Sequence, residues 1–192
     1  MFSVHFIMST FEELTKVLLN RTPLPALVAP HPSNRSQRVI STPWNPKITE
    51  QLQQLQNSSS PPPLVALAAL HLLNDDIGSC HDIVEKREGE GICDYLHAIL
   101  HRREGDYWNS KYWCRRVKGK EFESIYGEDK YRRFGNSTAS GLEEARKRAQ
   151  AYVDRCEAVT KSGIKDEEEE LKSLQYDEMK KVFEFARGNF SA

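Results

Sequence analysis

The sequence predicts an all-α fold from three observations. No segment alternates apolar and polar residues with the period of two that marks a half-buried strand. From Leu142 onward, apolar side chains recur at helical spacing. A segment around His71 is repeated about 30 residues later around His101, with a short acidic turn at the same place in each copy. We therefore expect helical hairpins completed by C-terminal helices.

Composition narrows the class of protein. The chain has 192 residues, 39% of them hydrophobic and 29% charged, which suits one domain with an appendage. A formal net charge of −1 disfavours nucleic-acid binding and a membrane-surface role, and no apolar run approaches the roughly 20 residues that span a bilayer. The four cysteines form no CxxC pair, and the start does not read as a secretory signal. We expect reduced thiols in an intracellular, cytoplasmic protein.

Residues 1–60 are expected to form an N-terminal helix and an irregular arm. Ser9 or Thr10 can cap a helix, with Glu12 or Glu13 placed for a capping box. The Pro/Ser-rich stretch "RTPLPALVAPHPSNRSQ" then predicts a segment that wraps the surface. "ITEQLQQLQN" has the composition of another short helix.

Residues 61–160 are expected to form a hairpin core with a closing helix. The prolines at 61–63, after serines at 58–60, suit the start of the first hairpin, with serine as the cap and proline in the first helical position. Small residues on facing helices would let each pair approach closely. They are Ala68 and Cys80 in the first copy, and Ala98 and Ser110 in the second. Other positions that coincide are Leu70 with Leu100, Asp76 with Asp106, Ile77 with Tyr107 and Ile83 with Trp113.

The remaining chain divides into a connection and two helices. "KGKEFESIYGEDKYRRFGNSTASG" is punctuated by glycine and predicts a long connection. The closing helix has an apolar stripe made of Leu142, Ala145, Ala149, Tyr152, Val153 and Cys156. Residues 161–192 predict an amphipathic helix whose stripe is Leu171, Leu174, Met179, Val182, Phe183 and Ala186. The acidic run at 166–170 suits its positive N-terminal end.

Two resemblances rest on the repeated segment. "EGDYWNSKYWCRRV" is similar to the turn and second helix of tetratricopeptide repeats, although the spacing is shorter and the aromatic residue of the first helix is missing. "ALHLLNDDIGSCHDIVEK", "YLHAILHRREGDYWNSKYWCRRV" and "AYVDRCEAV" resemble a group of fungal hypothetical proteins with bacterial relatives, which carry the pattern LHxILHRxEGDYxNAxYW. Ser110 departs mildly from that pattern. The resemblance implies an intracellular protein with a helical fold, and it implies no particular reaction.

A cluster of chemically capable side chains lies on the first helix of the second copy. His97, His101 and Glu104 fall at i, i+4 and i+7 on one face, with Asp94 at its edge. Two histidines one turn apart can bind one divalent transition-metal ion, and a carboxylate would complete its coordination. His71 joins this cluster if the first helices of the two hairpins pack side by side. The competing interpretations are another catalytic or ligand-binding role and structural hydrogen bonding.

Basic and aromatic side chains adjoin this cluster. The basic ones are Arg102, Arg103, Lys111, Arg115 and Arg116, which can bind a phosphate or an acidic peptide, or instead pair with Glu104, Asp106 and other acids. Tyr107 and Trp113 fit the hairpin core. Trp108 and Tyr112, four residues apart, form a second stripe that faces a neighbouring element or a pocket.

Two functional hypotheses follow. The first is a helical-hairpin protein that binds a protein segment or a small acidic ligand. Its expected contact residues are His71, His97, His101, Arg102, Arg103, Trp108 and Tyr112. The second is an enzyme for which a divalent transition metal is a candidate cofactor, with His97, His101 and Glu104 as metal ligands or acid–base groups. The sequence leaves open whether the protein is an enzyme.

Overall fold

The computed structural model describes residues 10–31, 41–135 and 140–188, and the described residues are helical with no strand. The predicted all-α class is therefore confirmed. The helices are α1 (Phe11–Leu19), α2 (Pro46–Gln56), α3 (Leu64–Leu73), α4 (Ile77–Val84), the short 3₁₀ turn η1 (Glu85–Arg87), α5 (Gly91–Glu104), α6 (Tyr107–Arg116), α7 (Lys120–Tyr126), α8 (Asp129–Arg132), α9 (Leu142–Ser162) and α10 (Lys165–Gly188).

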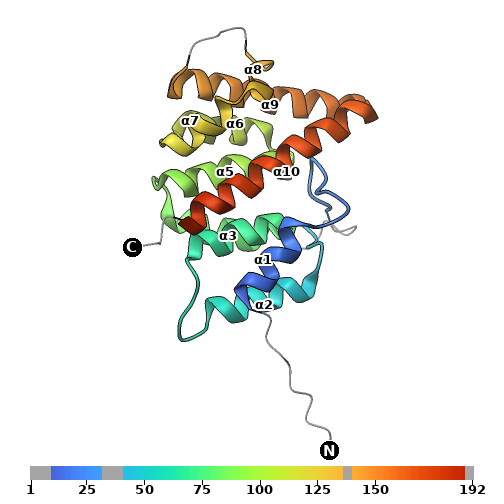
Figure 1. The fold of residues 1–192 in the computed structure, drawn as a ribbon. Helices are drawn as coiled ribbons and strands as arrows, with labels where there is room; N and C mark the ends of the chain where they lie inside the picture. The colour runs from blue at the N-terminus through green and yellow to red at the C-terminus, as the bar shows by residue number, and fades with distance from the viewer. Residues whose placement is uncertain (1–9, 32–40, 136–139, 189–192) are drawn as a thin grey trace, which may run out of the picture.

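Several of the helices stack in chain order, and α10 packs across the stack. Figure 1 shows α2, α3, α5 and α9 rising one above another, while α10 runs diagonally across the front. α10 packs on α3, α5, α7 and α9, so the last helix in the sequence contacts both hairpins. The predicted apolar stripe of α10 is buried at Leu171, Met179, Val182, Phe183 and Ala186, and Leu174 is half-buried.

The two central hairpins, α3–α4 and α5–α6, share the same turn. Their N-cap residues, Asp76 and Asp106, have nearly equal dihedral angles (φ −86°, ψ 70° and φ −87°, ψ 72°). Each caps its helix by accepting a backbone hydrogen bond three residues on, from Ser79 and Asn109. The small residues at the facing positions are buried, and Ser110 Oγ donates to the carbonyl of Ala98 at 2.6 Å. The likeness to tetratricopeptide repeats stays a prediction.

The N-terminal segment differs in part from its expected form. Thr10 caps α1 in a capping box with Glu13, as predicted; Ser9 lies outside the described residues. The expected cap of the first hairpin is wrong, because Pro63 is the N-cap of α3 and no side chain caps that helix. The segment after α1 does more than wrap the surface, since Arg21, Leu27 and Ala29 in it are buried.

The segment after α6 is also more ordered than predicted. Where we expected a long connection, the chain forms α7 and α8. Their buried side chains, Phe122, Ile125, Tyr126 and Tyr131, pack into the core beside α9. The glycines that suggested a loop lie between or beyond these helices. They therefore mark the ends of short helices and not a long irregular connection.

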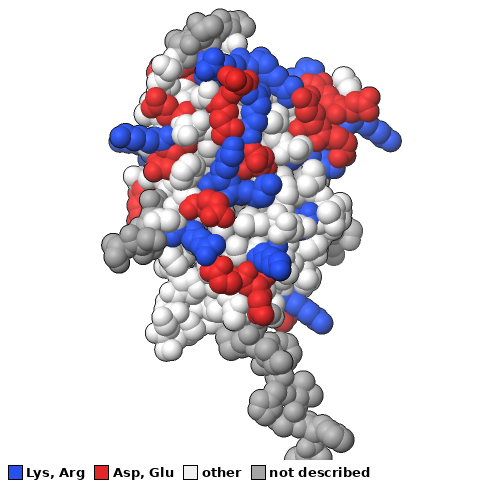
Figure 2. Space-filling model, in the orientation of Figure 1, with Lys and Arg blue, Asp and Glu red and all other residues white. Residues whose placement is uncertain are grey.

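Charge on the surface is mixed. In Figure 2, acidic and basic side chains alternate over the upper part of the molecule, and acidic ones gather where α10 begins. Asp166, Glu167 and Glu168 occupy the first turn of α10, as predicted from the helix dipole. No helix among the described residues is long and apolar enough to cross a membrane.

Candidate metal centre

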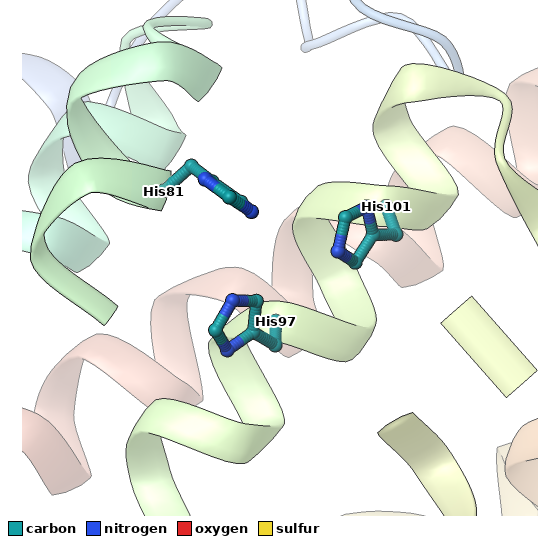
Figure 3. A group of neighbouring side chains, drawn as sticks. All are labelled: His81, His97 and His101. Carbon is teal, nitrogen blue, oxygen red and sulfur yellow. The ribbon is translucent and has the colours of Figure 1, made fainter. Parts of the chain in front are cut away.

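Three imidazole rings from two hairpins face one another. His97 and His101 lie one turn apart on α5, and His81 reaches toward them from α4 (Figure 3). One ring nitrogen from each of the three lies within 4.8 Å of the others. The ring centroids are 5.2 Å apart for His81 and His97, 5.5 Å for His81 and His101, and 5.7 Å for His97 and His101. Imidazole nitrogens gathered in this way are a donor set that transition metals favour.

The carboxylate of Glu104 orients His101. Its Oε2 lies 2.7 Å from Nδ1 of His101, and because a carboxylate only accepts, the ring proton is on Nδ1. In the neutral ring Nε2 then carries the lone pair, and the Asn109 amide nitrogen lies 3.1 Å from it. Glu104 was predicted as a ligand. In this geometry it fits the role of a carboxylate that fixes the ring of a ligand histidine.

His97 is the buried member of the cluster. It is 1% exposed, and its ring stacks on Trp113 with centroids 4.1 Å apart and planes 5° apart. Its Nδ1 is buried and has no hydrogen-bond partner among the described residues. Burial, together with the neighbouring His81, His101 and Arg116, lowers the pKa of His97 to about 3. The ring is therefore a neutral base with an uncommitted nitrogen.

His81 was not predicted as a site residue. The repeat aligns it with Lys111, so the internal comparison gave no signal for it. Its spacing from Ile77 and Val84, four residues after one and three before the other, places it beside the buried face of α4. The side chain is 25% exposed, and its Nδ1 lies 4.0 Å from the carboxylate of Glu85. It is thus the solvent-facing member of the cluster.

His71 does not join these three histidines. Its Nδ1 lies 2.9 Å from Oδ2 of Asp76, the N-cap of α4, and it is fully buried. Asp94, expected at the edge of the metal-binding face, accepts a hydrogen bond from the backbone of Gly89. The structure therefore separates His71 and Asp94 from the cluster on α4 and α5.

Arg102 and Arg103 lie inside the molecule and not on the contact surface we expected. They are 1% and 0% exposed. Arg102 forms a buried ion pair with Glu178 of α10 at 2.5 Å, and Arg103 pairs with Asp75 at 2.6 Å. In the sequence these two arginines belong to a local basic cluster, which predicted a basic contact surface. Their acidic partners come from distant parts of the chain, so the sequence spacing does not reveal the pairing.

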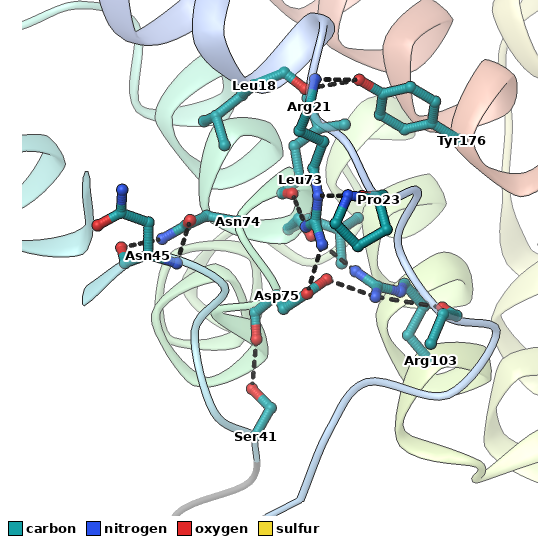
Figure 4. A network of polar contacts seen from close by, with 12 residues as sticks. Leu18, Arg21, Pro23, Ser41, Asn45, Leu73, Asn74, Asp75, Arg103 and Tyr176 are labelled. Carbon is teal, nitrogen blue, oxygen red and sulfur yellow. Dashed lines mark hydrogen bonds and ion pairs between the residues drawn. The ribbon is translucent and has the colours of Figure 1, made fainter. Parts of the chain in front are cut away.

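Asp75 holds a second arginine as well. Arg21, from the segment after α1, pairs with the same carboxylate at 3.0 Å and donates to the carbonyl of Leu73 (Figure 4). The carbonyl of Asp75 accepts from Ser41 Oγ at 2.6 Å. Asp75 thereby joins the N-terminal segment to both hairpins.

The other basic and aromatic side chains stay at the surface or near it. Lys111 pairs with Asp154 of α9, Arg115 donates to Gln150, and Arg116 donates to Tyr112. Their partners are therefore other groups than Glu104 and Asp106. Trp108 is 72% exposed and stacks on Tyr112, which is 36% exposed. Tyr107, half-buried, donates to Thr160, and Trp113 is in the core.

Fold and site together define an all-helical protein with a three-histidine cluster between two similar hairpins. No family model, no curated protein and no solved structure matches the chain. The resemblance to fungal hypothetical proteins therefore stays a prediction.

Proposed function

We propose that the protein binds a divalent transition-metal ion of the zinc type through His81, His97 and His101. The observation that carries this proposal is the convergence of three imidazole nitrogens within 4.8 Å, one of them buried on a ring whose Nδ1 has no partner among the described residues. Three histidines would leave the fourth position of a tetrahedral ion free for water or substrate, as in catalytic zinc sites. A metal-dependent hydrolytic activity is the enzyme class that such a site would support.

Binding would require a small closure of the cluster. With Zn–N bonds of about 2.0–2.1 Å, tetrahedral ligand nitrogens lie roughly 3.4 Å apart. The ring nitrogens would therefore approach one another by up to about 1.4 Å. His81, the least buried of the three, has the most freedom to move. At His101 the ion would replace the Asn109 amide at Nε2, while Glu104 would keep its hydrogen bond to Nδ1.

The test is a metal titration of protein purified without a histidine tag and stripped with a chelator. Calorimetry with Zn²⁺ and visible absorption with Co²⁺ should show one ion per chain. His81→Ala is the informative variant, because that side chain is partly exposed and its loss should spare the fold while abolishing stoichiometric binding. His31→Ala, at an exposed histidine outside the cluster, is the matched control and should bind normally.

Glu104→Gln separates the orienting role from a ligand role. It should weaken metal affinity about 10- to 100-fold, the usual effect of removing a partner of a ligand histidine, and keep the stoichiometry. Absence of stoichiometric binding by the wild-type chain, or binding that is unchanged in both His81→Ala and His97→Ala, would reject the metal site.

A second candidate function, binding a protein segment, is favoured by one observation. Trp108 and Tyr112 form an exposed stacked aromatic pair, with Arg116 lying over the Tyr112 ring. Exposed aromatic and arginine side chains are enriched at binding hot spots. Acidic peptides in an array should bind the wild-type chain and lose binding to Trp108→Ala; equal binding would reject this surface. The burial of Arg102 and Arg103 removes them from this hypothesis.

A further inference from the structure

His71 lies in a part of the molecule distinct from the candidate metal centre. Together with Gln53 and Asn57 near the end of α2, and Ser79, Asp82 and Lys86 along α4 and η1, it lines a cavity of about 260 Å³. The ring is 0% exposed, yet its Nε2 has no hydrogen-bond partner among the described residues. A buried polar atom without a partner is costly, so the unpartnered Nε2 of a residue that lines a cavity calls for an explanation.

The proton positions at His71 follow from its neighbour. The carboxylate of Asp76 accepts hydrogen bonds from Thr49 Oγ1 and from the backbone of Ser79, and its Oδ2 lies 2.9 Å from Nδ1 of His71. Burial raises the pKa of Asp76, but its hydrogen bonds with His71, Thr49 and the backbone of Ser79 help to lower it overall, so the carboxyl group is ionised. An ionised carboxylate only accepts, hence Nδ1 donates and, in the neutral ring, Nε2 carries the lone pair.

The second hairpin shows what the first one lacks. His101, the counterpart of His71, has partners at both ring nitrogens, Glu104 at Nδ1 and Asn109 at Nε2. The residue at the position of Asn109 in the first hairpin is Ser79, which is shorter and lines the cavity. A serine there leaves both space and an acceptor nitrogen, so a group from outside the chain can supply the missing donor.

We propose that this cavity binds a small, neutral polyhydroxylated molecule of monosaccharide or cyclitol size, with one hydroxyl donating to Nε2 of His71. The lining supports hydroxyls, which both donate and accept: the amides of Gln53 and Asn57 do both, Asp82 accepts and Lys86 donates. The charges of Asp82 and Lys86 offset each other, which favours a neutral ligand. The volume is below the about 300–1,000 Å³ of pockets for larger ligands, so the occupant is small.

The test uses saturation-transfer NMR with three probes, myo-inositol, D-glucose and 1,4-dioxane. Dioxane has oxygen acceptors but no donor, so it cannot satisfy Nε2. The wild-type protein should transfer saturation to at least one of the two polyols and none to dioxane. Because the cavity is apart from the histidine cluster, the result is independent of whether a metal binds.

Ser79→Asn is the decisive variant. It places in the first hairpin the amide that occupies this position in the second, and it should weaken polyol binding roughly five- to tenfold, the loss expected for one neutral hydrogen bond. It should also raise the midpoint of thermal unfolding. Ser173→Asn, the same change at an exposed position of α10, is the matched control and should alter neither measurement.

A second variant covers the case in which Ser79→Asn disturbs the fold. Gln53→Ala, on the exposed face of α2, should weaken the same polyol and leave the unfolding midpoint unchanged. Failure of both polyols to bind, equal transfer to dioxane, or polyol binding unaffected by both Ser79→Asn and Gln53→Ala would overturn the proposal.

Discussion

Asp75 combines an uncommon backbone conformation with two buried ion pairs. It is the one non-glycine residue in the described part of the chain with a positive φ, 62°, in the left-handed region that side chains other than those of Asn and Asp rarely adopt. Its carboxylate binds Arg21 and Arg103, and all three side chains are buried. The local backbone cost is thus offset by a paired buried charge.

Replacing Asp75 by Asn should therefore destabilise the fold strongly. Asn tolerates the same backbone conformation, so the change isolates the charge and leaves two buried guanidinium groups without a counter-charge. We expect a loss of about 3–5 kcal/mol in the free energy of unfolding, measured by urea denaturation. Glu12→Gln, which breaks the exposed pair with Arg187, should cost less than about 1 kcal/mol. Similar losses in the two variants would contradict this account.

His97 should make the metal-free protein less stable in mild acid. Its pKa falls from 6.5 unfolded to about 3 folded, so between these values the unfolded chain binds one more proton. The stability due to the neutral ring is fully present above pH 6.5 and is lost as the pH falls toward 3, by up to about 1.4 kcal/mol per pH unit. With a chelator present, wild type should lose about 1.6 kcal/mol more than His97→Gln between about pH 6.5 and 5.0. Parallel losses would refute the assignment.

At the scale of elements, the two hairpins form the same turn with different residues at its left-handed position. The left-handed position is Asp75 in the first and Gly105 in the second, where φ is 79°. A Cβ at Gly105 would meet only Val28, at 3.9 Å, so space is not the constraint. The backbone conformation alone favours glycine there.

Gly105→Ala should accordingly cost about 1 kcal/mol of unfolding free energy, and Gly105→Asn clearly less, because Asn adopts the left-handed region more readily. Gly78→Ala is the control of opposite sign. Gly78 is helical and has open space where a Cβ would lie, so Ala there should stabilise α4 by about 0.5–1 kcal/mol. Chemical denaturation of the three variants measures this; equal costs for Ala and Asn at position 105 would show that packing, and not φ, sets the preference.

At the scale of the whole molecule, one buried polar network joins three helices. Glu178 of α10 accepts from Arg102 of α5, from Tyr126 of α7 at 2.6 Å and from Tyr95 of α5 at 3.0 Å. Burial and the nearby Glu178 charge raise the pKa of both tyrosines, so they remain donors. The network fixes how α10 crosses the hairpin stack.

Glu178→Leu should reduce the unfolding free energy by about 3–5 kcal/mol, because it leaves Arg102 buried and uncompensated. The double variant Arg102→Met with Glu178→Leu removes both charges and should recover much of that loss. Urea unfolding followed by circular dichroism gives both values. A double variant as unstable as the sum of its single changes would show that the two groups act independently.

The apolar periodicity of the sequence predicted the buried residues correctly where burial follows from spacing within one helix. The stripe of α9 is buried at Ala145, Ala149, Tyr152, Val153 and Cys156, because a helix that packs on one side must repeat its apolar residues every three or four positions. The repeated acidic turns were predicted because their contacts are also local. Asp76 and Asp106 each accept a hydrogen bond from the backbone three residues further along the chain. The prediction of a loop after α6 was wrong because α7 and α8 are too short to show periodicity.

The candidate site was predicted only in part, and the reason why some of its residues were missed is physical. His97 and His101 share a helix, so their spacing alone placed them on one face. By itself, then, the sequence determined the longer helices with a clear apolar stripe, their buried faces and the acidic turns, all of which depend on residues within one or two helical turns. Only the tertiary structure decided that His81 joins the cluster, that Glu104 holds His101, and that Arg102 and Arg103 are buried against Glu178 and Asp75. Apart from Glu104, these partners lie on other elements, and the packing of those elements brings the charges and rings together.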